Sequence, residues 1–351
     1  MIAHLERLFA EHGRIPFSRY MAEVLYHPKH GYYSSDSDRI GVGGDFYTAS
    51  DLDSALGDLL ADLFLRMSTT MDAFGLIEIG AGKGLLARHV LGRRRFPYLI
   101  IERSSAMRRR QEVNLREFDV EWRDELPADF EGCVFSNEFF DALPVRRFVR
   151  RRGDLKEIFV SEGFKEVEGS PENELDLPVE EGCLTDLSLE AHAWMKRIGR
   201  SLVRGYHLVI DYGYLRDEFF ARRNGTLMCY HRHRTSEDPY THIGEQDMTA
   251  HVNFSDLIDI GSEEGLDLAG YTTQMDFLID LGLLGVMAPL AEAGDAASIR
   301  RLQALKNLLL PPMMGERFKV LLQQKGMGST PMPGFRRVAM SGEKPLSGNC
   351  T

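Results

Sequence analysis

The feature that most constrains this chain is a short apolar run followed by three closely spaced glycines. Residues 74–79 are mostly apolar, Gly80, Gly82 and Gly84 follow directly, and residues 85–91 show helical spacing. Glycine has no Cβ atom, so it lets the backbone turn sharply and approach a ligand closely. The pattern therefore predicts a strand, a tight turn and a helix, with the turn as a candidate ligand site.

Two phosphate-binding patterns do not fit this turn. The dinucleotide pattern needs a third glycine at position 85, where the chain has Leu85. A P-loop needs glycine at position 77 and serine or threonine at position 84, which are Ile77 and Gly84 here. What remains is Glu78 followed by alternating glycines, and a generic tight turn without a ligand stays open as the alternative.

Short apolar runs alternate with helical segments through much of the chain. This alternation is typical of a parallel sheet whose two faces are both covered by helices, so we predict an α/β fold. The expected strands are 74–79, 98–101, 120–122, 132–136 and 207–210. The expected helices within this part of the chain are 85–91 and 107–117.

The remaining segments predict the domain organisation. Residues 1–70 are expected to form a helical N-terminal extension, and residues 71–351 the main domain. Insertions are expected at about 146–195 and 214–254, the first holding a strand or hairpin and an acidic loop. The helices expected in the extension are 2–11, 16–25 with Ser18 as a candidate cap, and 54–67.

Composition argues against several kinds of function. The net charge of −11 would repel a phosphate backbone, so nucleic-acid binding is not expected. The four cysteines form no CxxC pair, which favours reduced thiols in a cytosol-like compartment. The longest apolar stretch, residues 281–291, is too short to span a bilayer. No metal site is expected, because the spacing of these histidines matches no ligand pattern: His231, His233, His242 and His251.

The glycine turn resembles the first motif of class I methyltransferases, which use S-adenosylmethionine (SAM). In that family the glycine loop cradles the methionine part of SAM, and an acid at the end of the second strand binds the ribose hydroxyls. Glu102 ends the second expected strand, 20 positions after Gly82, and a carboxylate accepts two hydrogen bonds from a vicinal diol. Asp45 follows two glycines and either contacts SAM or closes an Asx-turn. The resemblance implies these cofactor-binding residues: Glu78, Gly80, Gly82, Gly84, Glu102 and Asp45.

Further motifs extend the resemblance over almost the whole chain, and it is identified as a member of the complex I assembly factor 7, or MidA-like, family of protein-arginine methyltransferases. The chain departs from the family pattern after Thr48, where it has Ala49 to Ser54, and at Asn253, where aspartate is more usual. The motifs that carry the resemblance are Pro16-Phe17-Ser18-Arg19-Tyr20-Met21, His30-Gly31-Tyr32-Tyr33, Gly43-Gly44-Asp45-Phe46-Tyr47-Thr48, Asn137-Glu138-Phe139-Phe140-Asp141-Ala142-Leu143-Pro144-Val145, Asp211-Tyr212-Gly213, Gly225-Thr226-Leu227, His251-Val252-Asn253-Phe254 and Met314-Gly315-Glu316-Arg317-Phe318.

Three polar residues after the fourth expected strand are the catalytic candidates. In open α/β sheets the reacting group lies beyond the carboxyl ends of the strands. Glu138 and Asp141 could grip a guanidinium through paired hydrogen bonds, with Asn137 as a polar positioning residue. The alternatives are that Asp141 caps the next turn and that Glu138 is a solvated loop acid.

The resemblance also implies a fold, a substrate and a location. It implies a Rossmann-like, seven-stranded, mostly parallel sheet, and a protein substrate, the homologue of the 49-kDa subunit of NADH:quinone oxidoreductase. The product would be symmetric dimethylarginine. Because the chain starts directly with the family domain, without a presequence, we expect a bacterial cytoplasmic member of the family. Two alternatives stay open: SAM-dependent methylation of a small molecule or another protein side chain, and a non-catalytic assembly factor that binds SAM.

Overall fold

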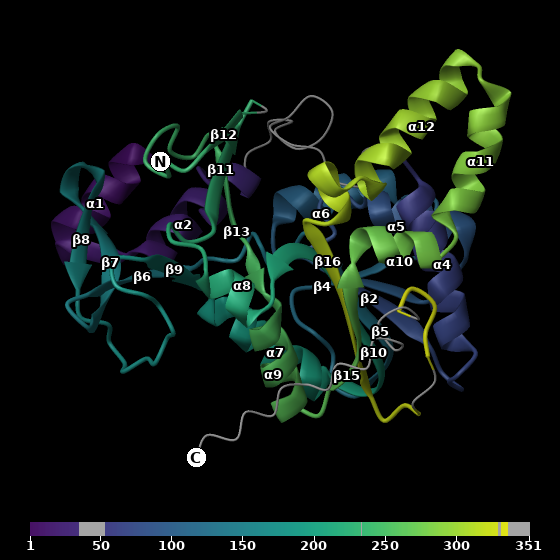
Figure 1. Cartoon of the computed structure of the whole chain (residues 1–351), viewed down its shortest axis with the longest axis horizontal. Coiled ribbons are helices and arrows are strands. Elements are labelled where there is room, and N and C mark those ends of the chain that lie inside the picture. Colours follow the sequence, from purple (N-terminus) through teal and green to yellow (C-terminus); the bar gives the residue numbers. More distant parts are fainter. Residues whose placement is uncertain (35–52, 233, 329–330, 336–351) are drawn as a thin grey trace.

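The central feature of the computed structural model is a mixed sheet in the order β15-β16-β10-β5-β2-β3-β4 (Figure 1). The structure describes residues 1–34, 53–232, 234–328 and 331–335. The strands β10, β5, β2, β3 and β4 run parallel, whereas β16 is antiparallel to both its neighbours. The bounds are β2 Gly75–Ile79, β3 Tyr98–Ile101, β4 Glu121–Arg123, β5 Phe130–Asn137, β10 Leu202–Tyr214, β15 Asp267–Thr273 and β16 Phe318–Lys325.

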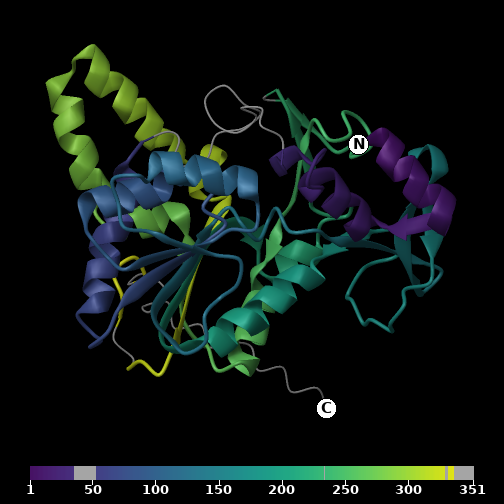
Figure 2. The ribbon, with the colours of Figure 1, turned by 180° about the vertical axis from the view of Figure 1, so that it is seen from behind.

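The apolar strands bury both faces of this sheet, because successive side chains point to opposite sides. In β2, Leu76 joins the core on one face, and Ile77 and Ile79 join the core on the other. The first face is covered by α4 and α5, and the second by α7 and α9 (Figure 2). Those helices are α4 Ala55–Ser68, α5 Leu85–Arg93, α7 Leu189–Ser201 and α9 Phe254–Glu263.

The α/β prediction is confirmed, and the differences lie in detail. The sheet has eight strands instead of seven, because β14 (Val252–Asn253) adds a short parallel pairing to β10. The helix expected over 107–117 is α6, Ser105–Asn114, which begins earlier because the Ser104 hydroxyl accepts the N–H of Met107. Ser18 is not a cap: α2 (Phe17–Tyr26) begins after Pro16 and has no side-chain cap.

A second lobe combines the N-terminal segment with both predicted insertions. Helices α1 (Ile2–His12) and α2 pack on two small sheets through a shared apolar core that includes Phe17, Val160 and Met248. The N-terminal segment is not purely helical, because β1 pairs antiparallel with β7. The strands of the first sheet are β1 Arg14–Pro16, β6 Arg146–Arg151, β7 Asp154–Ser161, β8 Lys165–Gly169 and β9 Leu184–Leu187. Those of the second are β11 Leu227–His231, β12 Arg234–Ser236 and β13 Asp247–Ala250.

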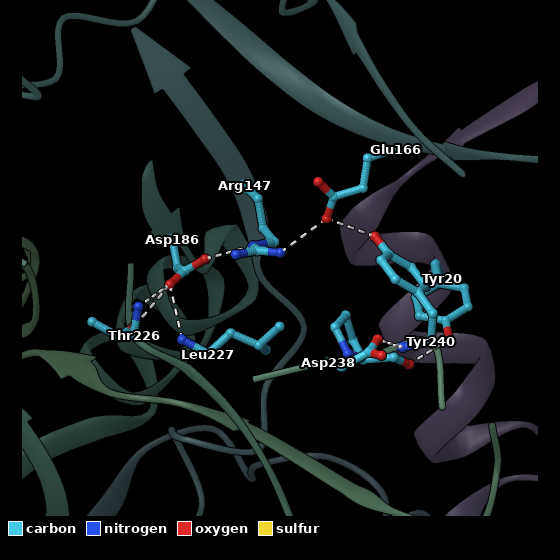
Figure 3. Close-up of polar contacts among 9 residues, drawn as sticks. Tyr20, Arg147, Glu166, Asp186, Thr226, Leu227, Asp238 and Tyr240 are labelled. Carbon is cyan, nitrogen blue, oxygen red and sulfur yellow. Dashed lines mark hydrogen bonds and ion pairs between the residues drawn. The ribbon is translucent and has the colours of Figure 1, made fainter. Parts of the chain in front are cut away.

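Ion pairs of the buried Arg147 help to hold this lobe together (Figure 3). Arg147 donates to Asp186 and Glu166, both at 3.2 Å. The second oxygen of Asp186 accepts the backbone N–H groups of Thr226 and Leu227, and the Thr226 hydroxyl at 3.0 Å. The Gly225-Thr226-Leu227 motif is therefore structural, since it closes a fully buried carboxylate.

The remaining elements are short or project from the body. The hairpin of α11 (Leu283–Ala293) and α12 (Ala296–Leu309) extends away from the sheet, on the side opposite the N-terminal lobe (Figures 1 and 2). Among the described residues, no single helix has the length and apolar character needed to cross a membrane. The helices α10 (Gln274–Asp280) and α11 reach that length and apolar character only when taken together, and they are bent by 79° relative to each other. The others are η1 Tyr32–Ser34, η2 Glu162–Phe164, α8 Arg216–Phe220, α10 Gln274–Asp280 and η3 Pro311–Gly315.

Candidate functional site

The three glycines of the turn after β2 serve two different purposes. All have left-handed φ angles, 68° at Gly80, 53° at Gly82 and 77° at Gly84. A Cβ atom on Gly80 would lie 2.6 Å from the Phe139 ring, and one on Gly84 would lie 3.1 Å from Leu115. A Cβ on Gly82 would meet nothing within 4 Å. A Cβ at 80 therefore clashes with the Phe139 ring, and one at 84 would require the Leu115 side chain to shift, whereas Gly82 borders open space.

That open space is a cavity of about 930 Å³ at the carboxyl end of the central strands. Gly80 and Gly82 form one wall, and Glu102 with the start of α6 forms another. Asn137 and Glu138 line it from the end of β5. Gly84 and Asp141 are not among its lining residues, and Asp45 lies outside the described residues. The other walls include residues of α2, the loop after it, η1 and α7, namely Ala22, Tyr26, Pro28, Lys29, Tyr33, Ser34, Glu190 and Trp194.

Glu102 is held at the cavity wall by a short hydrogen-bond chain. Its Oε1 accepts the Ser104 N–H at 2.7 Å, and its Oε2 accepts the Gln111 side-chain amide at 3.1 Å. The same Gln111 amide donates to the Gly82 carbonyl at 2.8 Å, which ties the acid to the glycine turn. Burial raises the pKa of Glu102. Each carboxylate oxygen keeps a further lone pair for a ligand hydroxyl.

Glu78 lies beneath the glycine turn and is 2% exposed. Its Oε2 accepts the hydroxyl of Tyr98 at 2.6 Å. Burial raises the pKa of Glu78 to about 7, although the Tyr98 bond opposes the shift. The sequence placed both Glu78 and Glu102 at the turn, and the structure brings both to the cavity.

Glu138 is presented to the cavity by a strained turn that Asp211 holds in place. Glu138 has a φ of 54°, unusual for a residue with a side chain, and its N–H donates to the Ile210 carbonyl at 3.0 Å. The Oδ2 of the fully buried Asp211 accepts the next two N–H groups, Phe139 at 3.1 Å and Phe140 at 2.9 Å. Asn137 donates its side-chain amide to Glu138 Oε1 at 3.0 Å. Asn137 and Glu138 are thus a fixed polar pair.

Asp141 does not line the cavity and lies in a buried polar cluster with Tyr212. It is 3% exposed, and burial raises its pKa to about 6, partly offset by a hydrogen bond from Tyr212. Its Oδ1 has no hydrogen-bond partner among the described residues. The prediction that Asp141 and Glu138 grip one ligand together is therefore not supported by the lining, since only Glu138 reaches the cavity.

The structure brings together one group of possible metal ligands that the spacing of histidines in the sequence did not indicate. Ligand atoms of His4, Glu23 and His27 lie within 4.8 Å of one another, from α1 and the end of α2. The Nδ1 of His27 accepts the N–H groups of Lys29 and His30, at 3.2 and 3.3 Å. In a neutral ring the proton then sits on Nε2, where a metal would need a lone pair. The cluster is better explained by the His4–Glu23 hydrogen bond of 2.8 Å.

The cavity fits a nucleoside that carries a charged amino-acid chain. Glu102 can accept two hydroxyls, the open backbone at Gly82 leaves room for close approach, and the buried acid Glu78 suits a nearby cation. Tyr26, Tyr33, Glu190 and Trp194 also line the cavity, and the sequence assigned none of them to the site. Of these four residues, only Tyr33 belongs to a motif of the family resemblance, His30-Gly31-Tyr32-Tyr33.

Comparisons with known proteins agree with this geometry. Residues 55–272 match the profile of a family described as S-adenosyl-L-methionine-dependent methyltransferase. The chain is 28% identical to the mitochondrial protein arginine methyltransferase NDUFAF7 of Bos taurus, over 92% of this chain and 82% of that protein. The human protein of the same name is 26% identical, over 91% and 82%. A Burkholderia thailandensis crystal structure with S-adenosyl-homocysteine bound is 31% identical, with a TM-score of 0.86 over 95% of this chain and 94% of that one.

Proposed function

Because this chain belongs to the family of S-adenosyl-L-methionine-dependent methyltransferases and uses SAM, we propose that it is a class I enzyme that methylates an arginine of a protein substrate. The proposal rests on the position of Glu138, whose carboxylate lines the cavity from a turn fixed at the carboxyl end of β5. A carboxylate there can bind a guanidinium through charge-assisted hydrogen bonds. The names of the relatives support arginine as the acceptor.

The side chains of this site have separate tasks. SAM supplies a methyl group on a positively charged sulfur. Gly82 and Glu102 bind and orient the cofactor at the turn and at its ribose. Glu138 orients the guanidinium nitrogen that forms the new bond to carbon, and it is placed to accept the proton that this nitrogen releases. Asp211 is a positioning residue, because its carboxylate holds the turn that presents Glu138.

The finer parts of the proposal come from the family resemblance. We assign symmetric dimethylarginine as the product and the 49-kDa-type subunit of NADH:quinone oxidoreductase as the target, in a bacterial cytoplasm. The relatives are named as mitochondrial protein arginine methyltransferases, which supports a protein acceptor. The net charge of −11 favours a basic, arginine-bearing segment over an acidic one.

Labelled SAM tests the proposal directly. The purified chain is incubated with methyl-labelled SAM and the recombinant 49-kDa-type subunit, and the protein is then hydrolysed to amino acids. We expect label in symmetric dimethylarginine. A second incubation replaces the subunit with a cell lysate. Label in small molecules of that lysate would indicate a different acceptor, and SAM binding without any transfer would indicate a non-catalytic assembly factor.

The Glu138→Gln variant links the activity to this site. It keeps the size of the side chain and removes its charge, so SAM affinity should stay close to that of the wild type. Transfer should fall by about a hundredfold, the scale expected when reacting atoms are misaligned by about 1 Å. Normal transfer by this variant would contradict the assignment of Glu138, and loss of SAM binding would make Glu138 a cofactor or folding residue.

A further inference from the structure

Two tyrosines and an acid form a part of the cavity wall that is separate in sequence from the glycine turn and Glu102. Tyr26 comes from the last turn of α2, Tyr33 from η1 and Glu190 from the first turn of α7. The rings of Tyr26 and Tyr33 are stacked, with centroids 5.4 Å apart and planes 22° apart. Tyr26 lines the cavity and is 40% exposed, so the stacked pair is not fully covered by protein.

Hydrogen bonds tie this wall to the chain segment that carries Glu138. The Tyr26 hydroxyl donates to the Ala142 carbonyl at 2.6 Å. Ser188, the N-cap of α7, donates to the Pro144 carbonyl at 3.1 Å and accepts the N–H of Ala191. The end of α2 and the start of α7 are therefore both anchored to residues 142–144, which follow Glu138 closely in the chain. These bonds hold Tyr26, Glu190 and Glu138 in a constant arrangement.

The surroundings of these rings are acidic. Burial raises the pKa of Tyr26 well above its usual value, and Asp247, Asp141 and Glu190 act in the same direction. The Tyr33 hydroxyl donates to Asp247 at 2.8 Å, so both hydroxyls are engaged away from the open ring faces. Basic residues also line the cavity, namely Lys29, Lys83, Arg103 and Arg109. Arg103 lies 5.6 Å from the Trp194 ring centroid and donates to the Asp124 carbonyl.

Open aromatic faces beside carboxylates form a site for a planar cation, since the ring face is electron-rich and a guanidinium is weakly hydrated. We infer that Tyr26, Tyr33 and Glu190, together with Glu138, form the acceptor pocket: a guanidinium stacks on a tyrosine ring and is held between two carboxylates. This inference rests on the proposed function and adds the residues that choose the acceptor. A neutral side chain of the same shape would lose both the cation–π attraction and the charge-assisted hydrogen bonds.

The test compares three peptides that differ at one position. Each is a short Gly/Ser peptide with a central arginine, citrulline or lysine, titrated into the protein saturated with S-adenosyl-homocysteine. The arginine peptide should bind at least about tenfold more tightly than the citrulline peptide, because citrulline cannot make hydrogen bonds from a charged donor. It should also bind more tightly than the lysine peptide, which cannot stack as a plane.

Variants assign the effect to the pocket. Glu190→Gln and Tyr26→Leu should each weaken binding of the arginine peptide by about threefold to tenfold. Tyr26→Phe keeps the ring but loses the hydroxyl bond to the Ala142 carbonyl, so it should bind less tightly than the wild type and more tightly than Tyr26→Leu. Glu180→Gln removes the same charge at an exposed position and is the matched control. S-adenosyl-homocysteine affinity, measured for every variant, shows that the protein is folded.

The outcomes separate this inference from the proposed function. Equal affinity for the arginine and citrulline peptides, no binding of the arginine peptide at millimolar concentration, or wild-type affinity in both Glu190→Gln and Tyr26→Leu would overturn the pocket. Methyl transfer to arginine that persists in such a case leaves the proposed function standing. Selective arginine binding by a protein that methylates no arginine would support the pocket and refute the proposed function.

Discussion

Replacing Glu78 by glutamine should make the ligand-free protein more stable at pH 8 and change little at pH 5. Glu78 is 2% exposed, and burial raises its pKa from 4.5 to about 7. The folded state therefore keeps a proton on this carboxyl between pH 4.5 and 7 that the unfolded chain releases. Its contribution to stability is complete below pH 4.5 and is lost as pH rises to about 7.

The size of this loss follows from the shift. One pKa unit corresponds to about 1.4 kcal/mol, so the rise from 4.5 to about 7 lowers the free energy of unfolding by about 3 kcal/mol above pH 7. Glutamine carries no charge at any pH, so Glu78→Gln should recover most of this energy. The Tyr98 hydroxyl, which donates to Glu78 at 2.6 Å, can still donate to the amide oxygen. Because the Tyr98 bond to a carboxylate is stronger than one to an amide, the gain should stay below the full value.

Urea denaturation at pH 5 and pH 8, at constant ionic strength, measures the effect. Fluorescence and circular dichroism should give coincident transitions, and the denaturant dependence should match between the wild type and the variant. Glu180→Gln, which removes an exposed charge, is the control and should follow the wild type. If Glu78→Gln gains no stability at pH 8, the carboxyl is not a buried acid that resists ionisation, and the reasoning is wrong.

Two further predictions concern the cofactor site and the second lobe. Gly82→Val should abolish SAM binding in calorimetry, because a branched side chain would enter the cavity at a residue with a φ of 53°; Glu102→Ala should weaken binding by about 1–3 kcal/mol. Wild-type affinity in Gly82→Val would contradict the site. Asp186→Ala should lower the free energy of unfolding by about 3–5 kcal/mol, because it leaves the Arg147 guanidinium buried with one partner fewer. An unchanged urea midpoint would show that the lobe does not depend on this ion pair.

The sequence by itself determined the elements whose signals are local. The strand β3 was predicted with its observed bounds, Tyr98–Ile101, because an apolar run ends sharply at the charged Glu102. The turn after β2 was predicted because glycines at 80, 82 and 84 allow left-handed backbone that few other residues adopt. The place of Glu102 at the cavity follows from the rule that parallel strands end at one edge of the sheet.

Only the tertiary structure decided which carboxylates meet the cavity. Glu138 and Asp141 are three positions apart, yet a left-handed turn at Glu138, closed by Asp211, turns one toward the cavity and the other into a buried cluster. Tyr26 and Glu190 reach the same cavity from segments more than a hundred residues apart, through separate hydrogen bonds to the stretch after β5. The spacing of apolar residues and the residue types that form turns involve only residues close together in the chain, so they can be recognised in the sequence. The direction of a side chain in a turn, and contacts between distant segments, depend on how the whole chain packs.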